Sequence, residues 1–322
     1  MRLLTKGEVA MQVFNNIVFV SRGLTRDVDA LQQALSLARI YRADLQALVA
    51  CPDFPDDLAI YKDGYTRWLA EQLESALQVA REASGVGAQD CPVPVTVECG
   101  DTPAVRIIRH ALKQANDLVL KEAERHDDGR GFTAVDMELL RKCPCPVWLS
   151  RPPGKPWDQV KVAVAIDPQS AEPEGQALSL RLLQLSRSLA DTCNTELTIV
   201  SCWDFAAEEY LRGSPWVRMP EEELLEAVLG VQRRHRRDLE SAIKQSGIGG
   251  PTRIEHVRGR PEQRIPQLTK ERNIDILVMG SLGRTGIPGF VIGNTAENLV
   301  QALSCSLLAL KPNGFISPVK AY

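Results

Sequence analysis

Continuous apolar runs alternate with amphipathic segments along the whole chain. Runs such as 15–23, 43–54 and 116–121 are rich in Val, Ile and Leu and show little alternation of apolar and polar residues. This pattern is typical of parallel strands that are covered on both faces. Between the runs, apolar residues recur at helical spacing, as in the stripe Leu180, Leu182, Leu183, Leu185 and Leu189. The pattern predicts an α/β protein.

The order of these segments occurs twice, with a period of about 150 residues. Five pairs of segments correspond in order: 15–23 with 160–167, 43–54 with 195–205, 95–101 with 254–260, 116–121 with 274–280, and 140–152 with 301–312. The repeat predicts two doubly wound, Rossmann-like parallel-sheet domains in tandem, residues 16–152 and 158–312. A proline-rich connector, 151–157, joins them, with an N-terminal extension at 1–15 and a C-terminal tail at 313–322.

Composition indicates which partners and which cellular compartment to expect. A chain of 322 residues, 44% of them hydrophobic, can bury two cores. Its formal net charge of −3 argues against the basic stripe that nucleic-acid binding requires, so no DNA or RNA partner is expected. No apolar run approaches the ~18–20 residues that span a bilayer, and the start of the sequence lacks a signal-peptide core. We therefore expect a cytoplasmic protein with no membrane span.

Cysteine usage fits that compartment. The eight cysteines are spread over the chain, unlike the dense framework of a small secreted domain, so most are expected to be buried, reduced thiols. Cys143 and Cys145 are the only close pair. Their one-residue spacing matches neither a C-x-x-C redox motif nor a common zinc site, so we interpret them as packing residues.

The candidate chemistry lies in MGSLGRTGIPGFVIGNTAENLV, residues 279–300. This segment follows a buried strand and leads into a helix, where glycines let backbone N–H groups approach an anion and the helix start favours negative charge. The residues predicted to form the site are Gly280, Gly283, Arg284, Gly293, Asn294 and Thr295. It is not a P-loop, because the G-K-[ST] ending is missing. Asn294 has a second interpretation as a helix cap, and the glycines as loop formers, so spacing alone leaves both interpretations open.

Catalysis has little support in the sequence. The four histidines are His110, His126, His235 and His256, and none belongs to a catalytic triad or metal-ligand motif. His235 begins the charged run HRRDLE and is predicted to lie on an exposed helix face. His126-Asp127-Asp128 is predicted to be a solvated loop rather than a cation site. We predict no catalytic residue and no protein-bound metal.

The spacing Gly280-x-x-Gly283, nine residues, then Gly293 and a polar residue, resembles the nucleotide-binding signature of universal stress protein domains. The flanking sequences IDILVM and AENLVQALSCSLLALKP share the resemblance. It covers both copies, and the end of the first copy looks like the first domain of tandem bacterial members. The resemblance implies the adenine nucleotide alpha hydrolase-like form of the Rossmann-like fold. It also implies pairing of the closing strands, 146–150 and 307–311, as an internal pseudo-dimer, with a homodimer as further association.

The resemblance also implies roles for single residues. In nucleotide-binding members an acidic residue that ends the first strand lies near the adenosine, and Asp167 holds that place. Its alternative interpretation is a carboxylate that caps the loop. Cys202, near the end of the second strand, would border adenine through its backbone, and Met279 precedes the loop. Many binders have Ser or Thr after the last glycine, so Asn294 leaves the choice of nucleotide open.

The first copy departs from this signature. Neither loop glycine is kept, because Glu122 and Arg125 stand in their places, and a carboxylate there would repel phosphate. Arg22 replaces the acidic strand end, while residues 133–136 keep a helix-start pattern. We expect a degenerate domain with a structural or regulatory role.

Three functions are therefore compared. We favour a stress-response protein that binds ATP or ADP in its second domain, one nucleotide per chain, with no metal besides nucleotide-bound Mg and weak ATP hydrolysis at most. The first alternative is a binding protein for a hydrophobic or lipid-like molecule, held through the long helices near 61–84 and 222–247. The second alternative is an adenylating or phosphotransferring enzyme.

Overall fold

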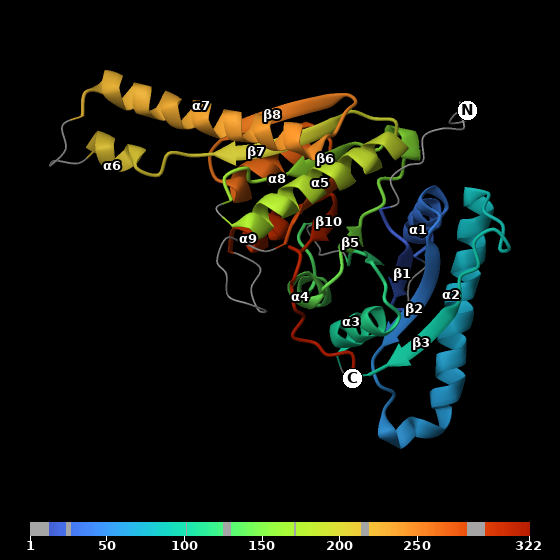
Figure 1. Ribbon diagram of the computed structural model, residues 1–322. Helices are drawn as coiled ribbons and strands as arrows, with labels where there is room; N and C mark the ends of the chain where they lie inside the picture. The colour runs from blue at the N-terminus through green and yellow to red at the C-terminus, as the bar shows by residue number, and fades with distance from the viewer. Residues whose placement is uncertain are drawn as a thin grey trace.

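The strands of the chain form one ten-stranded sheet (Figure 1). The computed structural model describes residues 13–23, 27–100, 102–124, 130–170, 172–213, 219–281 and 294–322. The strands are β1 (Asn16–Ser21), β2 (Asp44–Cys51), β3 (Val95–Cys99), β4 (Leu118–Glu122), β5 (Val147–Ser150), β6 (Val162–Ala165), β7 (Leu197–Trp203), β8 (Thr252–Arg258), β9 (Ile276–Gly280) and β10 (Ser306–Leu310). Their order in the sheet is β3-β2-β1-β4-β5-β10-β9-β6-β7-β8. Each half thus has the same doubly wound order.

Helices cover both faces of this sheet. They are α1 (Val28–Tyr41), α2 (Lys62–Ser84), α3 (Pro103–Lys113), α4 (Ala134–Lys142), α5 (Pro173–Thr192), α6 (Glu208–Gly213), α7 (Glu221–Ser246), α8 (Pro261–Glu271) and α9 (Asn294–Ala302), with short 3₁₀ helices at Asp56–Tyr61 and Trp157–Gln159. Residues of α1, α2, α5 and α7 enter the apolar core on one face, and residues of α3, α4, α8 and α9 enter the core on the other. The predicted α/β class with doubly wound parallel strands is confirmed.

The two halves join through their last strands. β5 and β10 pair antiparallel, with Trp148 opposite Leu308 and Leu149 opposite Leu307, whereas the other strand pairs are parallel. The Trp148 side chain is completely buried at this junction. The predicted pairing of 146–150 with 307–311 within one chain is therefore confirmed.

Local sequence fixes where the helices begin and end. Pro103, Pro173 and Pro261 begin α3, α5 and α8, a position where the missing proline N–H leaves no intrahelical bond unmade. The long helices α2 and α7 both end at a glycine of positive φ, 63° at Gly85 and 67° at Gly247. Glycine adopts this left-handed conformation without a steric penalty, so the corresponding helices of the two halves stop in the same way.

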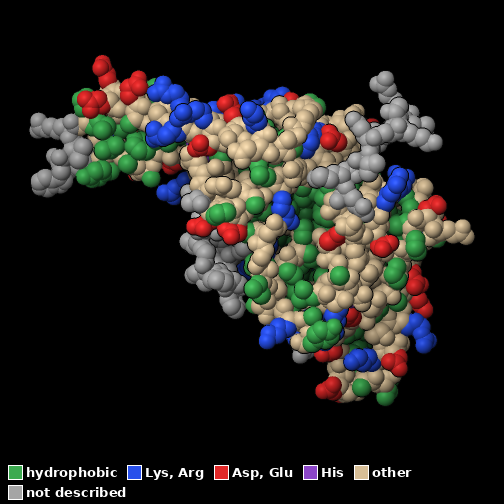
Figure 2. Space-filling view, in the orientation of Figure 1, with side chains coloured by type: hydrophobic (Ala, Val, Ile, Leu, Met, Phe, Trp, Pro, Cys, Tyr) green, Lys and Arg blue, Asp and Glu red, His purple; other side chains and the backbone are tan. Residues whose placement is uncertain are grey.

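Helix α7 corrects one prediction. Lys and Arg side chains gather along its outer face (Figure 2), as its charged sequence suggests. His235, however, is 3% exposed and contacts His256, so its predicted exposure is wrong. The reason is helical spacing: His235 lies seven residues after Val228 and four before Leu239, both buried, and so belongs to the inward stripe.

Two cysteines also differ from expectation. Cys51 and Cys99 stand opposite each other on the neighbouring strands β2 and β3 and form a disulfide, so the prediction of reduced thiols is wrong for this pair. The other six cysteines are free. No local pattern indicates this pairing, because the two residues are 48 positions apart and meet only through strand register.

The long helices lie at opposite ends of the sheet. α2 packs against α1 beside the edge strand β3, and α7 packs against α5 towards the edge strand β8 (Figure 1). They do not face each other across a common space, which weakens the idea that they enclose one lipid-like ligand. Within the described ranges, no helix is both long and apolar enough to cross a membrane.

Candidate functional site at the strand ends

In the second half, β6 and β9 lie side by side in the sheet, and the chain leaves them towards opposite faces. β6 lies between β7 and β9, and Ala165 pairs with Val200 on one side and with Met279 on the other. The helix after β6, α5, packs on one face of the sheet, and the helix after β9, α9, packs on the opposite face. In doubly wound sheets ligands bind beyond the carboxyl ends of strands at such a switch point. The β6–β9 switch point is therefore the candidate site.

Asp167 and Gly280 both lie at this switch point. Oδ1 of Asp167 accepts the backbone N–H of Gln169 at 3.0 Å, and the carbonyl of Asp167 accepts the hydroxyl of Ser179 at 3.2 Å. The side chain of Asp167 is partly exposed. One of its carboxylate oxygens thus shapes the loop, as the capping interpretation requires, while the side chain stays partly accessible to solvent.

Gly280 is required by packing as well as by position. A Cβ atom at this residue would lie 2.9 Å from Cδ2 of Leu178 on α5, closer than real Cβ contacts. Met279, one residue earlier, is 6% exposed and belongs to the apolar core on the α8 and α9 face. The backbone at the end of β9 therefore runs close to α5 because its last residue has no side chain.

The other residues predicted to form the site lie near the end of β7, at the start of α9 or outside the described residues. Cys202, near the end of β7, is half-buried, and burial raises the pKa of its thiol to about 11 despite the nearby Arg264, so the thiol stays protonated at neutral pH. Thr295 is exposed in the first turn of α9, and Asn294 is the first residue of that helix. Gly283, Arg284 and Gly293 lie outside the described residues, as do His126, Asp127 and Asp128.

The β1–β4 switch point is the counterpart in the first half. Ile17 pairs there with Leu118. Val162 pairs with Ile276 at the equivalent place in the second half. Counting along the strands, the corresponding residues are Arg22 and Asp167, Lys121 and Met279, and Glu122 and Gly280. The strand register thus confirms the correspondence drawn from the sequence for Arg22 and Glu122, whereas Arg125 lies outside the described residues.

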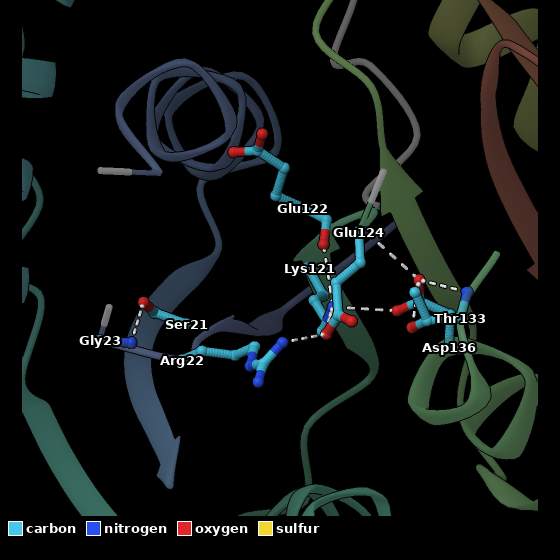
Figure 3. Close-up of polar contacts among 8 residues, drawn as sticks. All are labelled: Ser21, Arg22, Gly23, Lys121, Glu122, Glu124, Thr133 and Asp136. Carbon is cyan, nitrogen blue, oxygen red and sulfur yellow. Dashed lines mark hydrogen bonds and ion pairs between the residues drawn. The ribbon is translucent and has the colours of Figure 1, made fainter. Parts of the chain in front are cut away.

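An ion-pair network fills the first switch point (Figure 3). Nη1 of Arg22 lies 3.2 Å from Oε1 of Glu124, and Nζ of Lys121 lies 3.3 Å from the same oxygen. Nζ of Lys121 also lies 3.0 Å from Oδ1 of Asp136. Lys121 and Asp136 are 3% and 0% exposed. The two cations at this switch point, Arg22 and Lys121, are therefore paired with carboxylates of the same half.

Helix α4 holds this network in place. Thr133 and Asp136 form a capping box at the start of α4, which confirms the predicted helix-start pattern at 133–136. Burial alone would raise the pKa of Glu124, but the charges of Lys121 and Arg22 outweigh it and lower that pKa. The lowered pKa keeps the Glu124 carboxylate ionised beside the end of β4, and a negative charge there opposes phosphate.

The sequence did not reveal a histidine pair on the second half. Nδ1 of His235 lies 2.9 Å from Nε2 of His256, and the His256 ring stacks on Trp203 with centroids 5.9 Å apart. Burial lowers the pKa of His256, as do His235 and Arg236. Among the residues that the structure describes, no group of three or more His, Cys, Asp or Glu could hold a metal ion.

Comparisons with known proteins agree with this architecture. The model of the universal stress protein family matches residues 14–151 and 161–311. Universal stress protein E of Escherichia coli K12 is 30% identical over 328 residues, which cover 96% of this chain and 98% of the relative. Protein PA1789 of Pseudomonas aeruginosa PAO1 has the same fold, with a TM-score of 0.69 and 22% identity over 96% of both chains. The chain belongs to the universal stress protein family.

Proposed function

We propose that the second half binds one adenine nucleotide, ATP or ADP, at the β6–β9 switch point, and that the first half binds none. The observation that carries the proposal is the difference between two equivalent places in one chain. At the first, Arg22 pairs with Glu124 and Glu122 ends the strand. At the second, Asp167 and Gly280 take those positions. A glycine leaves room for backbone N–H groups beside a phosphate, whereas a carboxylate repels it.

The proposed contacts follow the chemistry of each position. Asp167 lies near the adenosine, where its carboxylate accepts hydrogen bonds from ribose hydroxyls. Asn294 and Thr295 offer N–H groups and side chains to phosphate at the start of α9, where the helix dipole favours negative charge. The glycine-rich loop would add Gly280, Gly283, Arg284 and Gly293. Adenine would lie near the backbone of Cys202 and near Met279, and Mg would arrive with the nucleotide.

The proposed role is binding rather than turnover. No catalytic residue is proposed, and ATP hydrolysis would be slow at most. We place the activity in a cytoplasmic stress response, with 16–152 and 158–312 as the two domains and a homodimer as further association. The hydrophobic-ligand alternative has no support from the two long helices, because they lie at opposite ends of the sheet.

Isothermal titration of the full chain with ATP and with ADP tests the proposal. We expect one nucleotide per chain. Asp167→Ala is expected to weaken binding about 10-fold or more, because a hydrogen bond to a charged group contributes about 1.5–3 kcal/mol. A stoichiometry of two, or no binding at millimolar nucleotide, contradicts the proposal.

Arg22→Ala supplies the matched control. Arg22 is the counterpart of Asp167 at the other switch point, so its loss should leave the stoichiometry and the affinity unchanged. If Arg22→Ala weakened nucleotide binding while Asp167→Ala did not, the site would lie in the first half.

A further inference from the structure

Two cysteines meet at the junction of the halves. Cys143 ends α4, Cys145 follows Pro144 just before β5, and the two sulfur atoms lie 3.3 Å apart in a hydrogen bond. Cys143 is 0% exposed, whereas Cys145 is partly exposed. A disulfide requires the sulfurs to approach to about 2 Å, which is within reach of small side-chain rotations from this contact.

A buried lysine from the other half faces this pair. Lys311 follows β10 and is 5% exposed. Its Nζ donates to the carbonyl of Leu140 and, at 3.0 Å, to the hydroxyl of Ser281, and it lies 4.8 Å from the ring centre of Phe315. In the described part of the chain it forms no ion pair with a carboxylate. Cys143 and Cys145 are ionisable groups close enough for their charge to act on Lys311.

The two thiols and Lys311 shift one another's pKa values. The hydrogen bond from Cys145 lowers the pKa of Cys143, and the charge of Lys311 lowers it further, although burial opposes both. The same hydrogen bond and burial raise the pKa of Cys145, so the negative charge of the pair rests mainly on Cys143. Burial lowers the pKa of Lys311 to about 8, while Cys143 and Cys145 act in the opposite direction. A thiolate shared by the pair and stabilised by an ammonium group is the reactive form of cysteine.

Small molecules can reach Cys145. It lines a surface pocket of about 550 Å³ between the halves, together with Asp117 and Arg181. Cys145 differs in exposure from Cys193 and Cys305, which are buried. Cys145 therefore has both access to small molecules and a neighbouring thiol.

We propose that Cys143 and Cys145 form a reversible dithiol–disulfide site that exchanges with a low-molecular-weight disulfide. The pair first releases one proton to water and becomes a Cys143 thiolate that accepts a hydrogen bond from the Cys145 thiol. The proton of Cys145 then passes to Cys143 along this hydrogen bond, and the Cys145 thiolate attacks one sulfur of the small disulfide. A mixed disulfide forms on Cys145 and one small thiolate leaves. Cys143 then loses its proton to that thiolate and attacks the sulfur of Cys145.

The second small thiolate leaves in that step and takes the remaining proton from water. The net reaction oxidises two protein thiols to one disulfide and reduces one small disulfide to two thiols. Two electrons and two protons pass between them, so the exchange is balanced and reversible. Lys311 acts as a positioning residue that stabilises the thiolate.

Peptide mapping of the full chain, equilibrated in buffers of reduced and oxidised glutathione, tests this site. Free thiols are alkylated rapidly before mapping. As the buffer becomes oxidising, we expect the wild-type peptide with Cys143 and Cys145 to change from two alkylated thiols to an unalkylated disulfide, two hydrogen atoms lighter than the free dithiol. Reducing conditions should restore the two alkylated thiols. The disulfide of Cys51 and Cys99 maps to other peptides and does not interfere. Two alkylated thiols in every buffer, or glutathione retained on the wild-type pair, would overturn the proposal.

Variants test the role of Cys143 and the role of Lys311 separately. Cys143→Ser should retain glutathione on Cys145, because no neighbouring thiolate remains to displace it. Lys311→Met should slow alkylation of the pair at neutral pH about 10-fold, whereas Lys311→Arg should keep most of the rate. Cys193→Ala, at a buried free cysteine that directly follows α5, is the control and should leave the wild-type exchange unchanged. Equal rates for Lys311→Met and wild type would exclude the lysine from the site.

Discussion

Lys121 of β4 donates a hydrogen bond across 3.0 Å to Asp136 of α4, and both side chains are buried. The pair stands at the place in the first half that corresponds to the glycine-rich loop of the second. Together with Arg22 and Glu124 it connects β1, β4 and α4 (Figure 3). An internal ion-pair network therefore occupies this strand end in the first half, whereas Asp167 and Gly280 stand at the equivalent positions of the second.

Breaking this buried pair should strongly destabilise the chain. Lys121→Met leaves the Asp136 carboxylate without its cation, at an expected cost of about 3–5 kcal/mol in the free energy of unfolding. Urea unfolding followed by circular dichroism measures it. Lys142→Met is the control, since the partly exposed pair of Lys142 and Glu138 should contribute less than about 1 kcal/mol. Equal losses in the two variants would mean that the buried network is not important for stability.

Gly280 should not tolerate a side chain. Gly280→Ala places a Cβ atom against Leu178, and such overpacking is expected to cost about 1–3 kcal/mol. Thermal unfolding measures the change. Gly64→Ala in α2 meets nothing within 4 Å and should instead raise the melting temperature, because alanine favours a helix over glycine. Adding Leu178→Ala to Gly280→Ala should recover part of the loss; no recovery would exclude the contact as its cause.

Nucleotide binding should respond to charge in one half only. Gly283→Glu is expected to abolish the rise in melting temperature that ATP produces, because a carboxylate in the proposed loop repels phosphate. Arg125→Glu puts the same charge at the corresponding position of the first half and should leave that rise intact. A loss in both variants would point to a general effect of charge rather than to the proposed loop.

Acid should weaken the second half through His256. Its pKa is lowered from the ordinary value of 6.5 by burial, His235 and Arg236, with Glu240 acting more weakly in the opposite sense. The unfolded chain therefore binds more protons just below pH 6.5, so stability is full above that pH and falls as pH drops towards the folded pKa.

The fluorescence of Trp203 should report the same titration locally, because its ring stacks on His256. Melting temperature against pH measures the global effect. His256→Gln is expected to flatten the decline between pH 6.5 and 5, whereas His110→Gln in the first half should leave the Trp203 signal unchanged. A Trp203 signal that is constant over this range would contradict the assignment.

The sequence predicted the architecture more completely than it predicted the contacts of individual side chains. Continuous apolar strands and an ordered repeat predicted two doubly wound halves, and the pairing of β5 with β10 followed from the family resemblance. The exposure of His235 was misjudged because the surrounding charges were given more weight than its spacing from Leu239. The disulfide of Cys51 and Cys99 was missed because it depends on the register of two distant strands.

The class of fold, the repeat and the loss of both loop glycines in the first half follow from the sequence alone. They are local or periodic properties, since the spacing of apolar residues and the positions of glycines can be read directly from the chain. Only the folded structure shows which contacts occupy the first switch point and where two thiols lie near a cation. Lys121 reaches Asp136 across 15 positions, and Lys311 faces Cys143 from the other half. Such contacts depend on strand order and burial, which bring distant residues together and which no local pattern encodes.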